Sequence, residues 1–179
     1  MQMAATSGTW TLDQLHALPD DGDKYELVRG DLFVTPAPSH EHEMILVRLT
    51  NLLQPYVAAQ NLGFVFHPRA VVRYEGSEAE PDLMVRSAGP PGTDWDTAPA
   101  PLLVVEVVSP ATRDRDYGMK RQLYPDADVA EYWIVDADTR AVTIVRRGVA
   151  DAVEHYVIRW APAAAAAILD VKLSDVFGA

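Results

Sequence analysis

The chain has 179 residues, enough to bury a substantial hydrophobic core, and we expect residues 1–179 to form a single domain. It contains no cysteine, which excludes disulfides and thiolate zinc sites and fits a reducing compartment, so we expect a cytoplasmic protein. The formal net charge of −11 argues against general attraction to nucleic acid, and no run approaches about 18 consecutive apolar residues, so no membrane segment is expected.

The first predicted elements are a short helix and a β-hairpin. Residues 11–14 (TLDQ) have the pattern of a capping box and predict a helix that ends near Ala17. Residues 25–34 predict two short strands about a turn at Gly30, and this glycine turn explains the Arg-Gly-Asp tripeptide better than cell adhesion does. The longest predicted helix then runs from Ser39, its N-cap, to about Ala59.

Short strands and one further helix make up most of the remaining chain. Strands are predicted at residues 64–66, 70–74, 82–86, 102–108, 131–136, 141–145 and 155–160. A turn rich in glycine and acidic residues follows Tyr74, and an irregular loop covers residues 89–101. A helix is predicted from Arg113 to about Tyr124, with Pro125 helping to end it. The pattern indicates a mixed α/β fold.

A single glutamate, Glu106, interrupts the aliphatic run PLLVVEVVSP at residues 101–110. The run is short, β-branched and bounded by prolines, which is typical of a strand buried on both faces in a mixed or parallel sheet. Strand alternation places Glu106 on the same face as Val104 and Val108. Because an unpaired buried carboxylate costs several kcal/mol, Glu106 needs a partner, which could be an arginine, backbone donors or a bound cation.

A second acid, Asp82, directly follows Pro81 at the edge-like start of an earlier strand, where its carboxylate can point into a cleft. Carboxylates on neighbouring strands suit a hard cation such as Mg²⁺. Asp82 also fits an ordinary turn at the start of a strand. Lys120 lies four residues after Asp116 on the predicted helix, so its simplest interpretation is an exposed ion pair.

Several short motifs occur in one order along the chain: YELVRG at 25–30, His40, Pro81-Asp82, VEVVSP at 105–110, Lys120 with Tyr124, and EYWIVD at 131–136. Together they resemble the Uma-two family of bacterial proteins, described as restriction endonucleases within the PD-(D/E)XK nuclease superfamily. The resemblance spans about residues 11–136. It implies an α/β (mixed α+β) fold. This fold has a restriction-endonuclease-like mixed β-sheet core flanked by helices, with an N-terminal β-hairpin.

The same resemblance implies roles for individual residues. Asp82, Glu106 and the Val107 carbonyl match the ligands of a divalent cation, Mg²⁺ or Mn²⁺, and Glu26 matches the N-terminal catalytic acid. The superfamily lysine would fall at Val108, which is a departure from the motif.

Two helical positions complete the implied site. Lys120 stands at the family's lysine position and would supply the missing ammonium from a neighbouring helix. His40 matches the family's histidine and is expected to line the cleft. His40 and His42 are two residues apart, so on a helix they would not share a face, and we do not interpret them as a metal pair.

The implied function is metal-dependent hydrolysis of DNA phosphodiester bonds, with Lys120 orienting or deprotonating the attacking water. A homodimer would match the two-fold symmetry of a duplex. Two alternatives stay open: an inactive nuclease-fold module for binding or regulation, favoured by Val108 and the acidic surface, and a metal-dependent hydrolase of a non-DNA substrate, favoured by the net charge. Divalent-ion binding that requires both Asp82 and Glu106 would separate the enzyme from the module.

Overall fold

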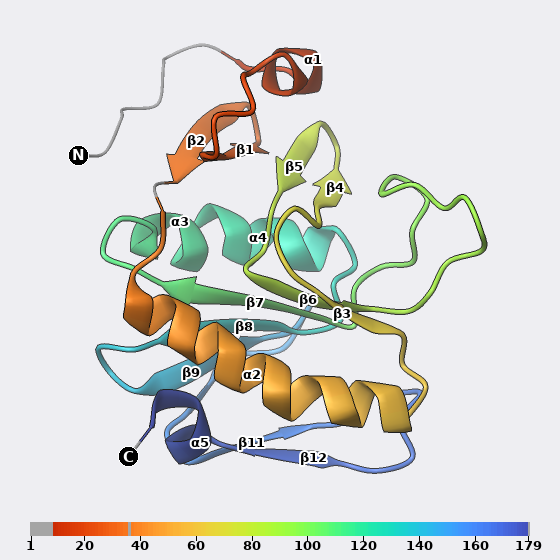
Figure 1. Ribbon diagram of the computed structural model, residues 1–179, viewed down its shortest axis with the longest axis vertical. Coiled ribbons are helices and arrows are strands. Elements are labelled where there is room, and N and C mark those ends of the chain that lie inside the picture. The colour runs from red at the N-terminus through yellow and green to blue at the C-terminus, as the bar shows by residue number, and fades with distance from the viewer. Residues whose placement is uncertain (1–8, 36, 179) are drawn as a thin grey trace.

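The computed structural model describes residues 9–35 and 37–178 as a mixed α+β fold in which three β-sheets are flanked by helices (Figure 1). The helices are α1 (Leu12–His16), α2 (His40–Ala59), α3 (Arg113–Tyr117), α4 (Met119–Asp126) and α5 (Leu173–Phe177). None of the helices in these two ranges is long and apolar enough to cross a membrane.

The largest sheet has six strands, in the spatial order β10 (Ala152–Glu154), β9 (Ala141–Val145), β8 (Tyr132–Asp136), β7 (Leu103–Val108), β6 (Leu83–Arg86) and β3 (Phe64–Phe66). Strand β7 pairs in parallel with β8 and antiparallel with β6, and all six of its residues are buried. This confirms the predicted buried strand of a mixed sheet around Glu106.

Two smaller sheets lie against this large one. The four-stranded sheet has the order β2 (Asp31–Thr35), β1 (Lys24–Val28), β5 (Ser77–Ala79) and β4 (Val72–Tyr74), and the two-stranded sheet pairs β11 (Val157–Trp160) with β12 (Leu169–Lys172). The predicted hairpin is confirmed, because β1 and β2 pair about Arg29 and Gly30, which both have positive φ, at +53° and +89°. Such a two-residue turn matches the twist of a hairpin.

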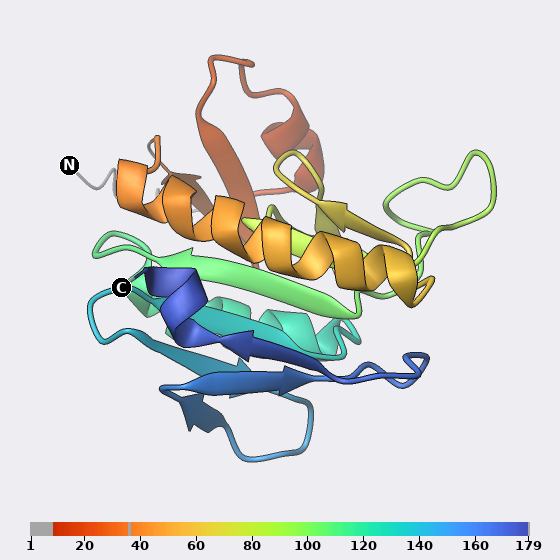
Figure 2. The same cartoon turned by 60° about the horizontal axis from the view of Figure 1, so that its bottom comes forward.

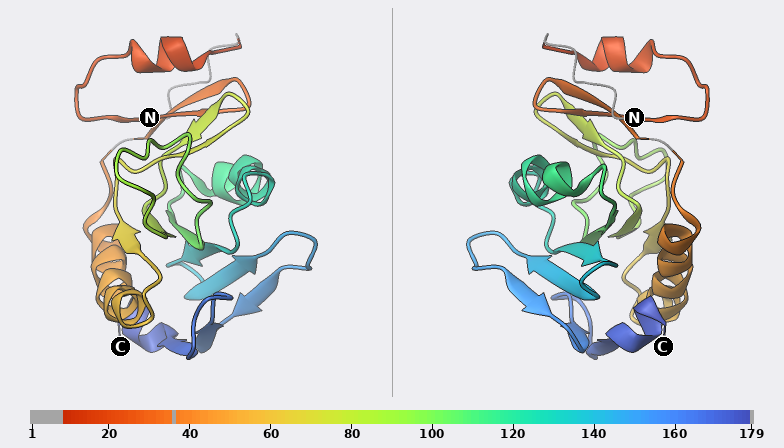
Figure 3. Two further views of the ribbon diagram at one scale, coloured as in Figure 1. Left: turned by 90° about the vertical axis from the view of Figure 1, so that its right-hand side faces the viewer. Right: turned by 90° about the vertical axis from the view of Figure 1, so that its left-hand side faces the viewer.

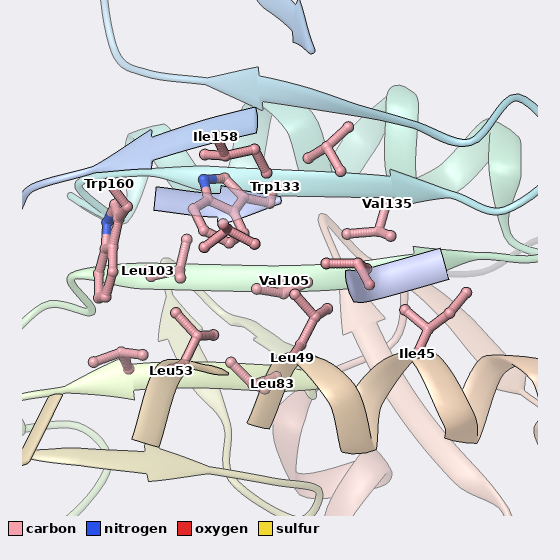
Figure 4. Close-up of a cluster of buried hydrophobic side chains, with 14 of the residues drawn as sticks. Ile45, Leu49, Leu53, Leu83, Leu103, Val105, Trp133, Val135, Ile158 and Trp160 are labelled. Atoms are coloured by element: carbon pink, nitrogen blue, oxygen red, sulfur yellow. The ribbon is translucent and has the colours of Figure 1, made fainter. Parts of the chain in front are cut away.

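Helix α2 covers one face of the six-stranded sheet. Ser39 caps it as predicted, its side chain accepting a hydrogen bond from the His42 N–H at 3.2 Å. Its apolar residues, among them Leu49 and Leu53, pack on Val105 and Trp133 of the sheet (Figure 4). Helix α5 lies beside α2 and completes this layer together with β11 and β12 (Figure 2). The three residues of β7 that face this layer, Leu103, Val105 and Val107, are all aliphatic.

Helices α3 and α4 and the four-stranded sheet cover the opposite face (Figure 3). Val104 and Val108 of β7 point here and pack in one cluster with Val28 of β1 and Tyr124 of α4, whereas Val105 belongs to the other layer. The predicted alternation of side chains along β7 is therefore confirmed.

Three sequence-based expectations need correction. The helix expected over residues 113–124 is two helices broken at Gly118, where a Cβ atom would lie 2.5 Å from the Asp114 carbonyl oxygen, and Pro125 lies inside α4. The predicted turn after Tyr74 is present at residues 75–76, but the strand β5 that follows it was not predicted. Asp82 is not at a sheet edge, because β6 lies between β3 and β7; Pro81 precedes that strand, so its missing N–H removes no ladder hydrogen bond.

Candidate active site

Glu106 lies at the bottom of the layer under α4, with 2% of its surface exposed. Its Oε1 accepts hydrogen bonds from Lys120 Nζ at 2.7 Å and from the Tyr124 hydroxyl at 2.5 Å. The partner of the buried carboxylate is therefore a lysine and a phenol on one face of α4. Lys120 does not form the exposed pair expected with Asp116: it is fully buried, and its Nζ lies 3.9 Å from Asp116 Oδ1.

Strand β1 brings a second carboxylate to the same ammonium group. Glu26 is fully buried, and its Oε1 lies 2.7 Å from Lys120 Nζ and accepts a hydrogen bond from the Glu80 N–H at 2.9 Å. Its Oε2 lies 3.3 Å from a guanidinium nitrogen of Arg115 on α3. Lys120 thus links an acid of the small sheet to an acid of the large sheet, so the structure brings Glu26, Glu106 and Lys120 together.

Asp82 occupies the position next to Glu106 on the neighbouring strand. Leu83 pairs with Val105 in the antiparallel register, and continuing that register by one residue sets Asp82 opposite Glu106. Asp82 Oδ2 accepts a hydrogen bond from the Val107 N–H at 2.9 Å. The two predicted metal-binding acids therefore lie side by side, Asp82 directly before β6 and Glu106 within the adjacent β7.

A lysine that the sequence analysis did not consider lies between these two acids. Lys24, the first residue of β1, places its Nζ 3.1 Å from Asp82 Oδ1 and 4.0 Å from Glu106 Oε2. Residues two apart in a strand lie on the same face, so Lys24 and Glu26 of β1 point the same way. This charged pair in a short predicted strand, in a chain with only three lysines, was the sequence signal for Lys24.

His42, rather than His40, faces the site. The ring Nε2 of His42 lies 3.1 Å from Asp82 Oδ2, while His40 is exposed and is not among the described residues that line the cavity. Positions two apart on a helix differ by about 200° in direction, so only one of the two can point at Asp82. The expectation that His40 lines the cleft is therefore wrong, although the residue that does so, His42, lies in the same first turn of α2.

The charges of this cluster shift the pKa values of its members in opposite directions. Burial raises the pKa of Glu106 to about 7, against the opposing effect of the Lys120 and Lys24 ammonium groups. Burial would also raise the pKa of Glu26, but the same two lysines outweigh it and lower the value to about 2. The pKa of Asp82 is lowered, because Lys24 and His42 outweigh burial. Glu106 is therefore the carboxyl group of the three that titrates nearest neutral pH.

A cavity of about 620 Å³ opens above the two acids. Lys24, Asp82, Glu106 and Arg115 lie in its wall, together with apolar side chains that include Leu46. Among the described residues, neither Lys120 nor Glu26 lines this cavity, which places both of them behind Glu106.

The acids of the cavity suit a divalent cation in their chemistry, although no ready-made metal cage is present. Across residues 9–35 and 37–178, no group of three or more histidine and acidic side chains is arranged to hold a metal ion. Carboxylate oxygens are nevertheless what Mg²⁺ and Mn²⁺ prefer, usually one or two with water completing the shell. The Lys24 ammonium group, 3.1 Å from Asp82 Oδ1 and 4.0 Å from Glu106 Oε2, already places one positive charge beside both acids.

Comparison with known proteins gives one family and one fold. The model of the Uma2 family, described as "putative restriction endonuclease", matches residues 12–168. A similar solved structure is that of a "putative nuclease belonging to DUF820" from Anabaena variabilis ATCC 29413, with a TM-score of 0.79 and 19% sequence identity, over 94% of this chain and 97% of that chain. At this identity the likeness shows the fold. No curated protein matches the chain.

Proposed function

Since the chain belongs to the Uma2 family, we propose that it is a metal-dependent endonuclease that hydrolyses DNA phosphodiester bonds. The observation that carries the proposal is the convergence of Asp82, Glu106 and a lysine ammonium at the floor of one cavity. A site with these groups provides the two things that phosphodiester hydrolysis needs, which are cation ligands and fixed positive charge.

The proposed cation ligands are Asp82, Glu106 and the Val107 carbonyl, with Mg²⁺ or Mn²⁺ as the ion. When bound, the ion would supply an activated water and positive charge beside the phosphate. Asp82 is held for this task by the Val107 N–H and by His42 on its Oδ2. The carboxylate direction is therefore set before any ligand arrives.

Lys120 and Glu26 act on this site through Glu106. Because Lys120 is fully buried and contacts Glu106 Oε1 at 2.7 Å, its ammonium group stabilises the ionised, ligand-ready form of that carboxylate. Glu26 holds the ammonium group from the other side at 2.7 Å. Lys120 thus compensates for Val108, which offers no charge from β7 itself.

The test measures cleavage of plasmid and duplex DNA in Mg²⁺, in Mn²⁺ and in a chelator. Wild-type protein is expected to cleave only with a divalent ion, while Asp82→Asn and Glu106→Gln lose at least about 10²-fold in rate, because each removes a charged ligand at nearly constant shape. Glu154→Gln, in edge strand β10, is the matched control and keeps the wild-type rate. Cleavage by Glu106→Gln at the wild-type rate would overturn the proposal.

One observation favours a second candidate, an inactive nuclease-fold binding module. Lys24 fills the position between the acids, as it would in a protein that had lost its metal. Calorimetric titration with Mn²⁺ separates the two candidates, because the nuclease requires binding that disappears in both Asp82→Asn and Glu106→Gln. The nuclease proposal also includes a homodimer, a DNA partner and a cytoplasmic location. Analytical ultracentrifugation tests the homodimer, and binding of a duplex oligonucleotide tests the DNA partner.

A further inference from the structure

Two of the three lysines of the chain meet at the candidate site, and they differ in what they can reach. Lys120 is fully enclosed and contacts carboxylates on two sides. The Lys24 side chain is 16% exposed and forms part of the cavity wall. A group that touches a substrate must be accessible from the cavity, and of these two lysines only Lys24 lines it.

The position of Lys24 also bears on the cation. Its ammonium group shares Asp82 and Glu106, at 3.1 Å and 4.0 Å, with any ion that those two carboxylates would bind. An ammonium group and a divalent ion cannot both lie between the same two carboxylates, because their charges repel at contact distance. Lys24 has the means to withdraw, since its charge is carried on a flexible four-carbon stem that begins at the first residue of β1.

The charge balance of the cluster favours this exchange. Its acids are Glu26, Asp82, Glu106 and Asp116, and its permanent cations are Lys24, Lys120 and Arg115, so with the four acids ionised and His42 neutral these groups carry one more negative charge than positive. If a divalent ion takes the place of the Lys24 ammonium group, the same set becomes formally neutral. The released ammonium group then faces the cavity, where a phosphate would add negative charge.

We propose that Lys24 is the catalytic lysine of this site: it holds the cation position until a divalent ion displaces it, and it then contacts the reacting phosphate. Lys120 is the positioning residue for Glu106. The inference rests on the proposed nuclease function, and it departs from the expectation that the lysine on α4 meets the water or the phosphate.

The experiment compares Lys24→Met, Lys24→Arg and Lys120→Met, with Lys172→Met, an exposed lysine on β12, as the matched control. Mn²⁺ affinity is measured by calorimetry, and circular dichroism verifies that each variant is folded. Lys24→Met is expected to bind Mn²⁺ about 10- to 10³-fold more tightly, the range by which a like charge at this distance shifts an ionic equilibrium. Lys120→Met is expected to bind it more weakly, because Glu106 loses its support.

The second measurement is single-turnover cleavage at saturating Mn²⁺. Lys24→Met is expected to fall about 10²-fold or more in rate despite its tighter metal binding, and Lys24→Arg to retain part of the activity, because it keeps the charge. Two outcomes would overturn the inference. One is a Lys24→Met variant with no tighter Mn²⁺ binding than wild type, and the other is a Lys24→Met variant with the wild-type cleavage rate.

A failure of the nuclease proposal would be visible separately, as wild-type protein that cleaves no DNA under any condition. In that case the midpoint of thermal unfolding, measured with and without Mn²⁺, still tests whether Lys24 occupies the cation position. Without metal, Lys24→Met leaves Asp82 and Glu106 facing one another, so Mn²⁺ is expected to raise its midpoint by several degrees more than that of wild type. An equal rise in both proteins counts against the placement of Lys24 at the cation position.

Discussion

On the face of the six-stranded sheet covered by α2, β7 buries only aliphatic side chains, whereas on the face covered by α4 the same strand buries Glu106 among paired charges. Both side chains are buried: Val105 has no exposed surface, and Glu106, which lies in the wall of the cavity, has only 2%. The first face gains stability from the removal of apolar area from water. On the second face, Val104 and Val108 also bury apolar area, but the attraction between the paired charges largely offsets the loss of their hydration, so the net contribution of those charges to folding is small.

The difference shows that an apolar side chain in a core needs only to be buried, whereas a buried charged side chain also needs a partner of opposite charge. An aliphatic layer tolerates loss of one member at a local cost, but in the charged layer each group is the partner of another. Lys120 alone contacts Glu26 and Glu106 at 2.7 Å each. We therefore expect substitutions of these charged residues to change stability more sharply than the small net contribution of their ion pairs suggests.

The largest expected effect on stability is that of Lys120→Met. It leaves Glu26 and Glu106 buried without their shared cation, so the free energy of unfolding should fall by about 3–5 kcal/mol at pH 7. Urea denaturation followed by circular dichroism measures the change. Adding Glu26→Gln and Glu106→Gln to the same chain should recover most of it, because the unpaired charges are then gone. A loss below about 1 kcal/mol in the single variant would show that Lys120 is not enclosed between the two acids.

On the aliphatic face, Leu49→Ala should lower the free energy of unfolding by about 2–5 kcal/mol, through lost apolar burial and a residual cavity. Leu49 has no exposed surface, whereas Val47 on the same helix is 51% exposed, so Val47→Ala is the matched control and should change stability by less than about 0.5 kcal/mol. Unlike Lys120→Met, Leu49→Ala should leave Mn²⁺ affinity unchanged. A parallel loss of Mn²⁺ affinity would mean that the two faces are coupled through β7.

The smallest expected effect lies at the rim of the charged face, where Arg113 of α3 donates to both oxygens of Asp136 at 2.9 and 3.1 Å. Against the effect of burial, these hydrogen bonds and those from Thr139 lower the pKa of Asp136. A lowered folded-state pKa stabilises the protein above the unfolded-state value, near 4, and that stability is lost as the pH falls through the folded-state value.

Asp136→Asn should therefore cost about 1–2 kcal/mol at pH 7, and its difference from wild type should shrink as the pH falls below about 4. Chemical denaturation at several pH values measures this difference. A constant gap between pH 7 and pH 3 would show that the ionised carboxylate is not what Arg113 stabilises.

The parts of the fold that depend on local chemistry could be predicted from sequence. The capping box at Thr11, the cap at Ser39, the hairpin at Gly30 and the alternation about Glu106 all follow from rules that act over a few residues, and each is found in the structure. The break at Gly118 was missed because it depends on a close approach to the Asp114 carbonyl oxygen.

The composition of the site was less predictable, because it depends on how one sheet packs on another. The side-by-side position of Asp82 and Glu106 follows from strand pairing. The position of Lys24 follows only once the small sheet is placed over the large one, which no periodicity in residues 24–28 reveals. His42 faces the site instead of His40 because contacts with the whole sheet set the rotation of α2 about its axis. The apolar pattern of the helix alone does not predict that rotation.

The assembly of this cluster from two sheets has a consequence for how the chain acquires it. Lys24 and Asp82 are 58 residues apart in sequence, and Glu106 meets Lys120 only after α4 has packed on β7. Contacts between distant segments form late, because the chain must first lose the entropy of the loops that they close. During synthesis, the hairpin therefore emerges with Lys24 and Glu26 well before their partners exist, and the charged cluster closes only when α4 arrives. A chain that has folded only in part carries an open cluster and no complete site.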